Sequence, residues 1–150
     1  MKTVKKMAAI VLVGAMALSI AACQKGAKKV SADDFKKACE EVGLTVTDGA
    51  AGEGVKESID AGNEDGTFEA AYMIAESKDD AKKAFELISS GVDALKDAGA
   101  DVKTSSSTVE VSMEGLTYMY AVQADDMIIT VSGNGDNIDA AKDLVKKLGI

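Results

Sequence analysis

The stretch STVEVSMEGLTYMYAVQADDMIITVSG, residues 107–133, holds three apolar-rich runs joined at two very short polar breaks. The runs cover 107–114, 116–124 and 127–133, and their β-branched and aromatic residues are typical of strands. The breaks, at Glu114-Gly115 and Asp125-Asp126, are too short for the crossover that a parallel connection requires. The stretch therefore predicts an antiparallel meander of three strands.

A β-hairpin is predicted upstream of this meander. VKESIDA (55–61) alternates apolar and polar residues, GNEDG (62–66) is rich in turn residues, and TFEAAYMIAE (67–76) resumes an apolar strand. Before the hairpin, TVTDGAAGEGV (45–55) predicts a short strand and a glycine-rich loop, which we do not count among the main strands.

Three segments carry apolar residues at helical spacing. The first, 31–44, has Ser31 as its N-cap and ends at Gly43. The second runs from residue 77 or 78 to Gly99, and the third, IDAAKDLVKKL (138–148), is capped by Asp136 or Asn137.

These segments follow one another in the order α-ββ-α-βββ-α. That order predicts an α+β domain over 31–150, in which an antiparallel sheet of about five strands has about three helices packed on one face.

The first thirty residues differ from the rest of the chain in composition. MKTVKK (1–6) is basic, and the run 7–20 is apolar except for Gly14 and Ser19. Fourteen helical residues span about 21 Å, short of the roughly 30 Å hydrocarbon core of a bilayer. The run therefore predicts a cleaved signal peptide over 1–22 rather than a membrane-spanning helix.

The end of this run, IAAC (20–23), resembles the lipobox of bacterial lipoproteins, in which an aliphatic and two small residues precede an obligatory cysteine. The resemblance implies cleavage between Ala22 and Cys23, and attachment of diacylglycerol with fatty acyl chains such as palmitate to Cys23. Two acyl chains anchor a protein stably, because each buried CH₂ contributes about 0.8 kcal/mol. Residues 23–30 then form a flexible lipidated linker with three cations beside the headgroups: Lys25, Lys28 and Lys29. The alternative is an ordinary secreted protein.

The predicted mature chain, without residues 1–22, is strongly acidic. It has 14 lysines, no arginine and 25 acids, a net charge of −11. Because this surface repels phosphates and lacks the guanidinium fork, nucleic-acid binding is disfavoured. The chain has no histidine, which excludes Ser-His-Asp and Cys-His catalysis and the usual zinc sites. We therefore predict a protein that is not an enzyme and holds no cofactor or metal.

Cys39 has no partner within the chain once Cys23 is acylated. It lies on the apolar side of the first predicted helix, so we predict a buried and inert thiol. A reactive or intermolecular thiol is the alternative.

Three segments together resemble a group of small lipoproteins of unassigned function from Clostridia-like Gram-positive bacteria. They are DDFKKACEEVG (33–43), DDAKKAFE (79–86) and MIITVSGNGDNIDAAKDLVKKLGI (127–150). The resemblance implies a Gram-positive envelope and a protein anchored by lipid at the outer face of the cell membrane. It implies no active site.

One glycine-containing loop suggests a phosphate site. SGNGDN (132–137) places Gly133 and Gly135 between a strand and a helix. However, Ile138 replaces the third glycine of the dinucleotide pattern, and Asp136 and Asp139 are negative where phosphate would bind. We predict a plain turn with a helix cap.

A second loop, AGNEDGTFE (61–69), partly matches a calcium loop. Asn63, Asp65 and Gly66 match positions 3, 5 and 6, but Ala61 and Tyr72 stand at positions 1 and 12, where ligands are essential. We predict a hairpin turn with solvated acids, and weak binding of a divalent cation is the alternative.

The domain also contains methionines and paired acids. The acids 79–80 and 125–126 are predicted to be solvated rather than to form an acid–base pair. Thioether metal sites usually include histidine or cysteine, so core packing is predicted for all four methionines of the domain: Met73, Met113, Met119 and Met127.

The middle strands, 67–76, 116–122 and 127–131, carry apolar residues on both faces. If helices cover one face only, the other presents an apolar patch for a partner protein or a small apolar ligand; if helices cover both faces, no patch is exposed. We expect an extracytoplasmic, lipid-anchored interaction module. The alternatives are a small-ligand or cation-binding lipoprotein associated with transport and an enzyme that uses serine and lysine.

Overall fold

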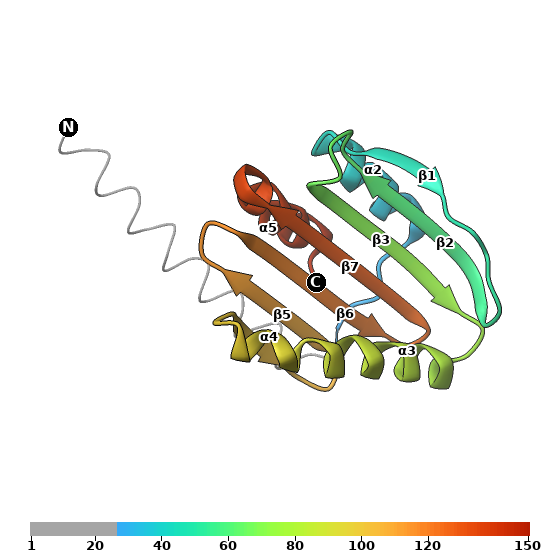
Figure 1. Cartoon of the computed structure of the whole chain (residues 1–150). Helices are drawn as coiled ribbons and strands as arrows, with labels where there is room; N and C mark the ends of the chain where they lie inside the picture. Colours follow the sequence, from blue (N-terminus) through green and yellow to red (C-terminus); the bar gives the residue numbers. More distant parts are fainter. Residues whose placement is uncertain (1–26) are drawn as a thin grey trace.

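The computed structural model describes residues 27–150, and its seven strands there form one antiparallel sheet, ordered β1-β2-β3-β7-β6-β5-β4 (Figure 1). Two meanders, β1 to β3 and β4 to β7, are joined where β3 pairs with β7, from Phe68↔Gly133 to Ile74↔Met127. The strands are β1 (Thr45–Asp48), β2 (Val55–Gly62), β3 (Phe68–Ala75), β4 (Asp101–Thr104), β5 (Thr108–Met113), β6 (Thr117–Ala124) and β7 (Met127–Asn134).

The α+β class and the two predicted strand groups are confirmed. β5, β6 and β7 form the predicted antiparallel meander, and β2 and β3 form the predicted hairpin. The tight connections depend on left-handed backbone at Gly115 (φ 69°) and Asp125 (φ 56°), a conformation that glycine and aspartate tolerate better than most residues.

The predicted number of strands and the order α-ββ-α-βββ-α are wrong, because the sheet has seven strands and the order of the main elements is α-βββ-αα-ββββ-α. The two additional strands, β1 and β4, are the edges of the sheet and have four residues each. Each contains one half-buried apolar residue, Val46 or Val102, so neither shows enough alternation to stand out in the sequence.

The helices of the described residues are α2 (Ala32–Glu41), α3 (Lys78–Gly91), α4 (Asp93–Asp97) and α5 (Ile138–Leu148), with a short 3₁₀ turn, η1 (Gly135–Asn137), before α5. As predicted, Ser31 caps α2: its hydroxyl oxygen accepts the Asp34 backbone N–H at 3.1 Å. Asn137 is the N-cap of α5, but its side chain does not bond to the helix.

The single helix predicted from residue 77 or 78 to 99 is divided into α3 and α4 at Val92. The Ser90 hydroxyl donates to the backbone oxygens of Glu86 (2.7 Å) and Leu87 (3.2 Å), and Gly91 follows directly. Serine back-bonding and glycine both weaken the regular hydrogen-bond pattern of a helix, which explains the break.

Helices lie on both faces of the sheet, so the prediction that they pack on one face is wrong. α2 and α5 cover one face, and α3 crosses part of the other over β3, β6 and β7 (Figure 1). Within residues 27–150 the core on the α2/α5 face contains 20 buried residues and the core on the α3 face contains 8.

Residues 27–30, which we call the strap, pack against the domain before α2 begins. Val30 is buried (6 % exposed) in the α2/α5 core, and Ala27 is half-buried against it. None of the helices in residues 27–150 is long and apolar enough to cross a membrane.

Candidate functional site

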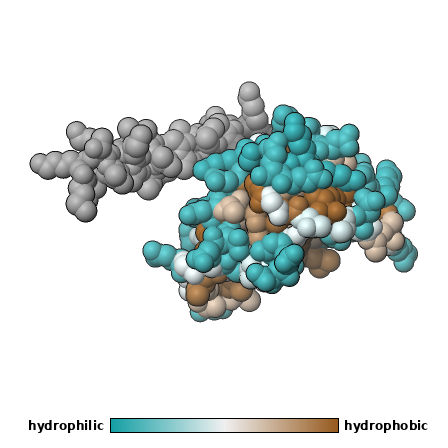
Figure 2. All heavy atoms as spheres, turned by 90° about the horizontal axis from the view of Figure 1, so that it is seen from above, coloured by the Kyte–Doolittle hydropathy of each residue, from teal (hydrophilic) through white to brown (hydrophobic). Residues whose placement is uncertain are grey.

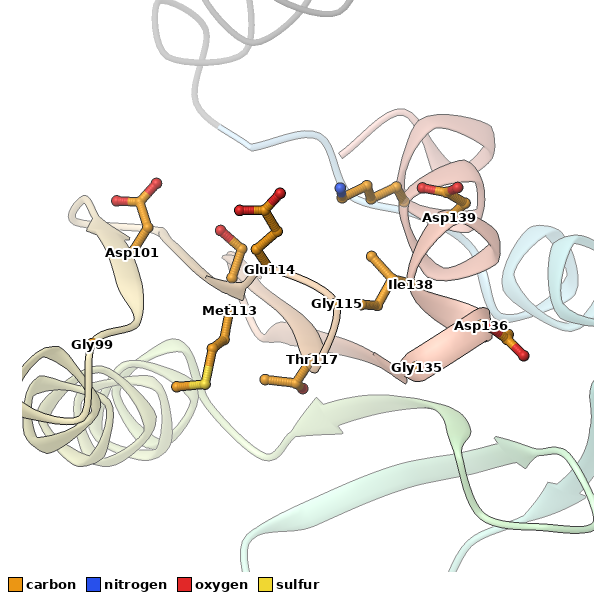
Figure 3. A pocket seen from close by; sticks show the side chains of 12 residues that line it. Gly99, Asp101, Met113, Glu114, Gly115, Thr117, Gly135, Asp136, Ile138 and Asp139 are labelled. Carbon is orange, nitrogen blue, oxygen red and sulfur yellow. The ribbon is translucent and has the colours of Figure 1, made fainter.

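A cavity of about 720 Å³ lies at the end of the sheet where β5 turns into β6 and where β7 leads through η1 into α5 (Figure 3). Antiparallel pairing brings the start of β4, the end of β5 and the start of β6 to this same end of the sheet. The cavity is lined by Gly99, Asp101, Ser112, Met113, Glu114, Gly115, Thr117, Gly135, Asp136, Ile138, Asp139 and Lys142.

The charged lining of the cavity is mainly acidic, with four carboxylates and one ammonium. In Figure 3 the side chains of Asp101 and Glu114 point to the same side of the strands, whereas Met113 points to the opposite side. The Lys142 ammonium lies 5.5 Å from the centroid of the Tyr118 ring, within range of a cation–π interaction. Burial, with a smaller effect of the nearby Glu110 carboxylate, raises the pKa of Tyr118. The Tyr118 phenol is therefore neutral at pH 7, and its ring contacts the Lys142 ammonium.

The lining offers charged groups and the hydroxyls of Ser112 and Thr117. Outside the lining, the bonds donated or shared by the Ser31, Ser77 and Ser90 hydroxyls go to carboxylates or backbone oxygens, and Ser105 bonds to Thr108. Among residues 27–150, no three or more cysteine, aspartate or glutamate side chains are placed to hold a metal ion. Reversible binding of a cationic or polar group is the chemistry that this lining supports.

A second cavity, of about 330 Å³, lies on the part of the α3 face that α3 leaves uncovered. The sheet there presents small or polar side chains and two acids, Asp60 and Glu69. The strands that contribute are β1, β2, β3 and β7, with Thr47, Ala71, Thr130 and Ser132 among the lining residues.

The two loops that the sequence singles out meet at the same end of the sheet as the larger cavity. The Asn63 side-chain oxygen accepts the backbone N–H groups of Thr67 and Phe68, as expected of a hairpin turn. The amides of Asn63 and Asn137 both donate to the Thr67 hydroxyl oxygen, at 3.0 and 2.9 Å. Polar side chains of the two loops, among them Asn63 of the calcium-like loop, therefore join the β2–β3 turn to η1.

Gly133 lets α5 lie directly on β7. A Cβ atom at this position would come within 2.5 Å of the Asn137 carbonyl oxygen and 2.7 Å of the Ala141 Cβ, closer than real side chains approach. Gly133 is a residue of strand β7 rather than of a turn, and it serves close helix–sheet packing rather than a phosphate cradle.

Three of the four methionines pack as predicted, and Met113 instead lines the larger cavity. Met127 is fully buried on the α2/α5 face, whereas Met73 and Met119 pack against the α3 core on the opposite face. These thioethers therefore do not converge on one site.

The acids of the β6–β7 turn are paired, not merely solvated as predicted. Asp125 pairs with Lys78 at 2.7 Å and Asp126 pairs with Lys29 at 2.5 Å. The hydrogen bond that Lys29 donates lowers the pKa of Asp126, and the hydrogen bond that Asp125 accepts from Lys78 raises the pKa of Lys78. At the start of α3, the Ser77 hydroxyl donates to the Asp80 carboxylate at 2.6 Å.

The predicted burial of Cys39 is confirmed. Its side chain is 0 % exposed on the inner side of α2, and burial raises the pKa of the thiol to about 12. Because the thiolate is the reactive form, this thiol is inert in the folded domain at neutral pH.

The prediction of an apolar patch on an uncovered sheet face does not hold for residues 27–150. Where α3 leaves the sheet uncovered, the side chains are polar or small. Large exposed apolar side chains among residues 27–150 are Leu87, Leu95 and Leu116, which lie on α3, α4 and the β5–β6 turn. Hydrophilic residues dominate the face seen in Figure 2, with smaller groups of hydrophobic residues between them.

The predicted lipidation site, Cys23, and the cleavage site at Ala22 lie outside the described residues. No family model matches the chain, and no curated protein matches its sequence. No residue role therefore transfers to this chain from a relative.

Sequence reasoning missed the larger cavity because its lining comes from segments distant in sequence. Asp101 belongs to the unpredicted edge strand β4, Glu114 to a turn, and Lys142 to α5. The sequence signal at 101–104 is weak, with Val102 as its one apolar residue, so β4 and its part of the lining were not predicted.

Proposed function

We propose that this protein is a lipid-anchored, extracytoplasmic binding protein of a Gram-positive envelope, which holds an acidic domain at the outer face of the cell membrane. The observation that carries the proposal is the sequence IAAC at 20–23, after a basic and then an apolar segment. The short distance from Cys23 to the strap agrees with it, because Ala27, four residues after the cysteine, packs against the α2/α5 core, so a lipid on Cys23 would hold the domain close to the membrane.

Binding rather than turnover is supported by the polar groups of the domain. The hydroxyls and amides that could serve chemistry, such as those of Asn63, Thr67 and Asn137, bond to one another. The charged groups without an ion pair among residues 27–150 include many surface carboxylates, such as Glu64 and Asp65, which suit recognition of a partner better than bond cleavage.

The test is mass spectrometry of the protein purified from its native membrane, with a Cys23→Ala variant as control. The expected N-terminal peptide begins at Cys23 and carries diacylglycerol, and the variant leaves the membrane fraction. An unmodified thiol at position 23, or a retained leader, contradicts the proposal.

A second candidate function, capture of a cation or small cationic ligand for transport, is favoured by the four carboxylates around the 720 Å³ cavity. A polyamine should then raise the melting temperature of the wild-type domain and not that of the Glu114→Gln/Asp139→Asn variant. Equal shifts in both proteins would assign the effect to general screening of the acidic surface.

A further inference from the structure

The strap fixes where the chain leaves the folded domain. The Val30 backbone N–H donates to the Met127 sulfur at 3.2 Å, and the Tyr72 hydroxyl donates to the Val30 carbonyl oxygen at 3.2 Å. One residue earlier, Lys29 pairs with Asp126 in the β6–β7 turn. Lys29, predicted to lie free beside the headgroups, is therefore held by the protein. We call this end of the sheet the tether end, and the end with the 720 Å³ cavity the far end.

The chain between the anchor and the tether end is short. Six residue steps separate Cys23 from Lys29, which reach about 20 Å at full extension. The eight-residue strands β6 and β7 alone span about 23 Å over their seven residue steps, and the turns at the far end extend beyond them. We call the segment from Cys23 to Lys29 the leash. Since the leash is shorter than the sheet, the far end cannot face a bilayer in which Cys23 is anchored.

We propose that the tether end docks against the lipid headgroups of the bilayer, so that the far end with its cavity points away from the membrane. This inference rests on the proposed acylation of Cys23. The docked surface consists of the strap, the β6–β7 turn and the start of α3, and the occupant is a phospholipid surface.

The charges of the two ends agree with this orientation. At the tether end both acids of the β6–β7 turn are neutralised by lysines, and Lys28 and Lys56 lie nearby. Four acids without an ion pair among residues 27–150 are also at this end, so it is mixed in charge rather than basic: Glu53, Glu57, Glu76 and Asp79. At the far end, Lys142 is the one lysine of the cavity lining, and five acids form no ion pair with another residue of 27–150: Glu64, Asp65, Glu114, Asp136 and Asp139. Anionic headgroups repel such a surface.

The test compares one probe position at each end of the acylated, full-length mature protein. Asp79→Cys places a thiol at the tether end and Asp65→Cys places one at the far end, and both positions are exposed. Cys39 remains unlabelled because it is buried with a pKa of about 12. Each variant is labelled with a fluorophore and reconstituted into vesicles of phosphatidylglycerol and phosphatidylcholine that carry a headgroup quencher. We expect quenching at position 79 to be several times stronger than at position 65.

A lengthened leash is the matched control. Twenty glycine and serine residues inserted between Gln24 and Lys25 add a root-mean-square reach of about 25 Å without changing the folded domain, and should bring the two quenching values together. Equal quenching with the native leash, or stronger quenching at position 65, would overturn the orientation while leaving the anchor intact. If the wild-type protein does not bind the vesicles, the proposed acylation and the orientation both fail.

Discussion

The two faces of the sheet differ in how completely they are covered. On the α2/α5 face, helices of 10 and 11 residues lie over β1, β2, β3, β6 and β7, and the buried side chains include Phe35, Ile59, Ile129 and Leu144. On the other face, α3 crosses only part of β3, β6 and β7, and the buried set is smaller, with Phe85 as its only aromatic residue among those described. The α2/α5 face therefore provides most of the stabilising burial, and the α3 face is left partly open.

Strand β7 shows how the sequence encodes this difference. Met127, Ile129 and Val131 point to the α2/α5 face and are all buried. On the α3 face the series is Ile128, Thr130 and Ser132, which changes from apolar to polar where the cover by α3 ends. The change from apolar to polar side chains along the α3 face of β7 therefore marks where α3 stops covering the strand.

The neighbours Ile129 and Ile128 allow the most direct test of this comparison, and the largest effect is expected there. Both are buried (0 and 3 % exposed) on opposite faces of the same strand. Ile→Ala substitutions in cores cost about 2–5 kcal/mol. We expect Ile129→Ala near the upper end of that range and Ile128→Ala near the lower end, because the thinner α3 layer relaxes more easily into the space that is vacated. Urea denaturation of the domain without its leader measures both.

Equal losses in the free energy of unfolding for the two isoleucine variants would contradict the conclusion that the two faces are packed unequally. The slope of the free energy of unfolding against urea should stay unchanged in both variants, since a changed slope would indicate that the unfolded or native state differs in compactness.

The close packing of α5 on β7 gives the next largest effect. Gly133→Ala places a methyl group against Asn137 and Ala141, and overpacking of this kind costs about 1–3 kcal/mol. Ser132→Ala, the adjacent position on the uncovered face, should change the free energy of unfolding by less than about 0.5 kcal/mol. Chemical denaturation of the two variants tests the pair, and a neutral Gly133→Ala would mean that α5 can move off the sheet freely.

The parts of the fold that the sequence predicts are those where local pattern and tertiary packing agree. The meander over 107–133 alternates strongly and has turn residues at both breaks, and the helix over 31–44 carries its own cap and stop. The break between α3 and α4 and the strand β4 depend instead on weaker signals: one serine back-bond, one glycine and one half-buried valine. Local propensity does not decide such positions, because packing against the finished sheet does.

The candidate site was less predictable than the fold. Its residues come together only once β4 joins the edge and η1 folds back beside the β5–β6 turn, where the Gly135 backbone N–H donates to the Leu116 oxygen at 3.1 Å. Conversely, the loops with the most suggestive sequences, 61–69 and 132–137, use their polar groups for each other. Sequence motifs indicated where polar groups cluster, and only their partners in the fold indicated what those groups do.

The strap extends the α2/α5 core, and its ion pair should contribute much less than the buried Val30. Asp126→Asn should lower stability by less than about 1 kcal/mol at pH 7, because the Lys29 pair is near the surface. Its dependence on pH has a definite sign. The folded-state pKa of Asp126 is lowered, so the contribution is present above the ordinary aspartate pKa of about 3.9 and is lost as pH falls through the folded-state value.

Thermal unfolding of wild type and Asp126→Asn from pH 7 to pH 2.5 checks this sign. The two melting temperatures should differ by a constant amount above pH 5 and converge below pH 4. A difference that grows on acidification would show that another group titrates with the strap.

The smallest effect is expected on the outer side of α3, at Leu87. This leucine is 75 % exposed, two positions after the buried Phe85, so Leu87→Gln removes almost no burial, and glutamine and leucine have similar helix propensity. The free energy of unfolding should change by less than about 0.5 kcal/mol. Binding of the acylated protein to vesicles should be unchanged, because the proposed orientation places the tether end, and not the side of α3, at the membrane. A loss above 1 kcal/mol that depends on protein concentration would mean that a second copy covers this side of α3, and the α3 face would then be completed by assembly instead of being left partly open.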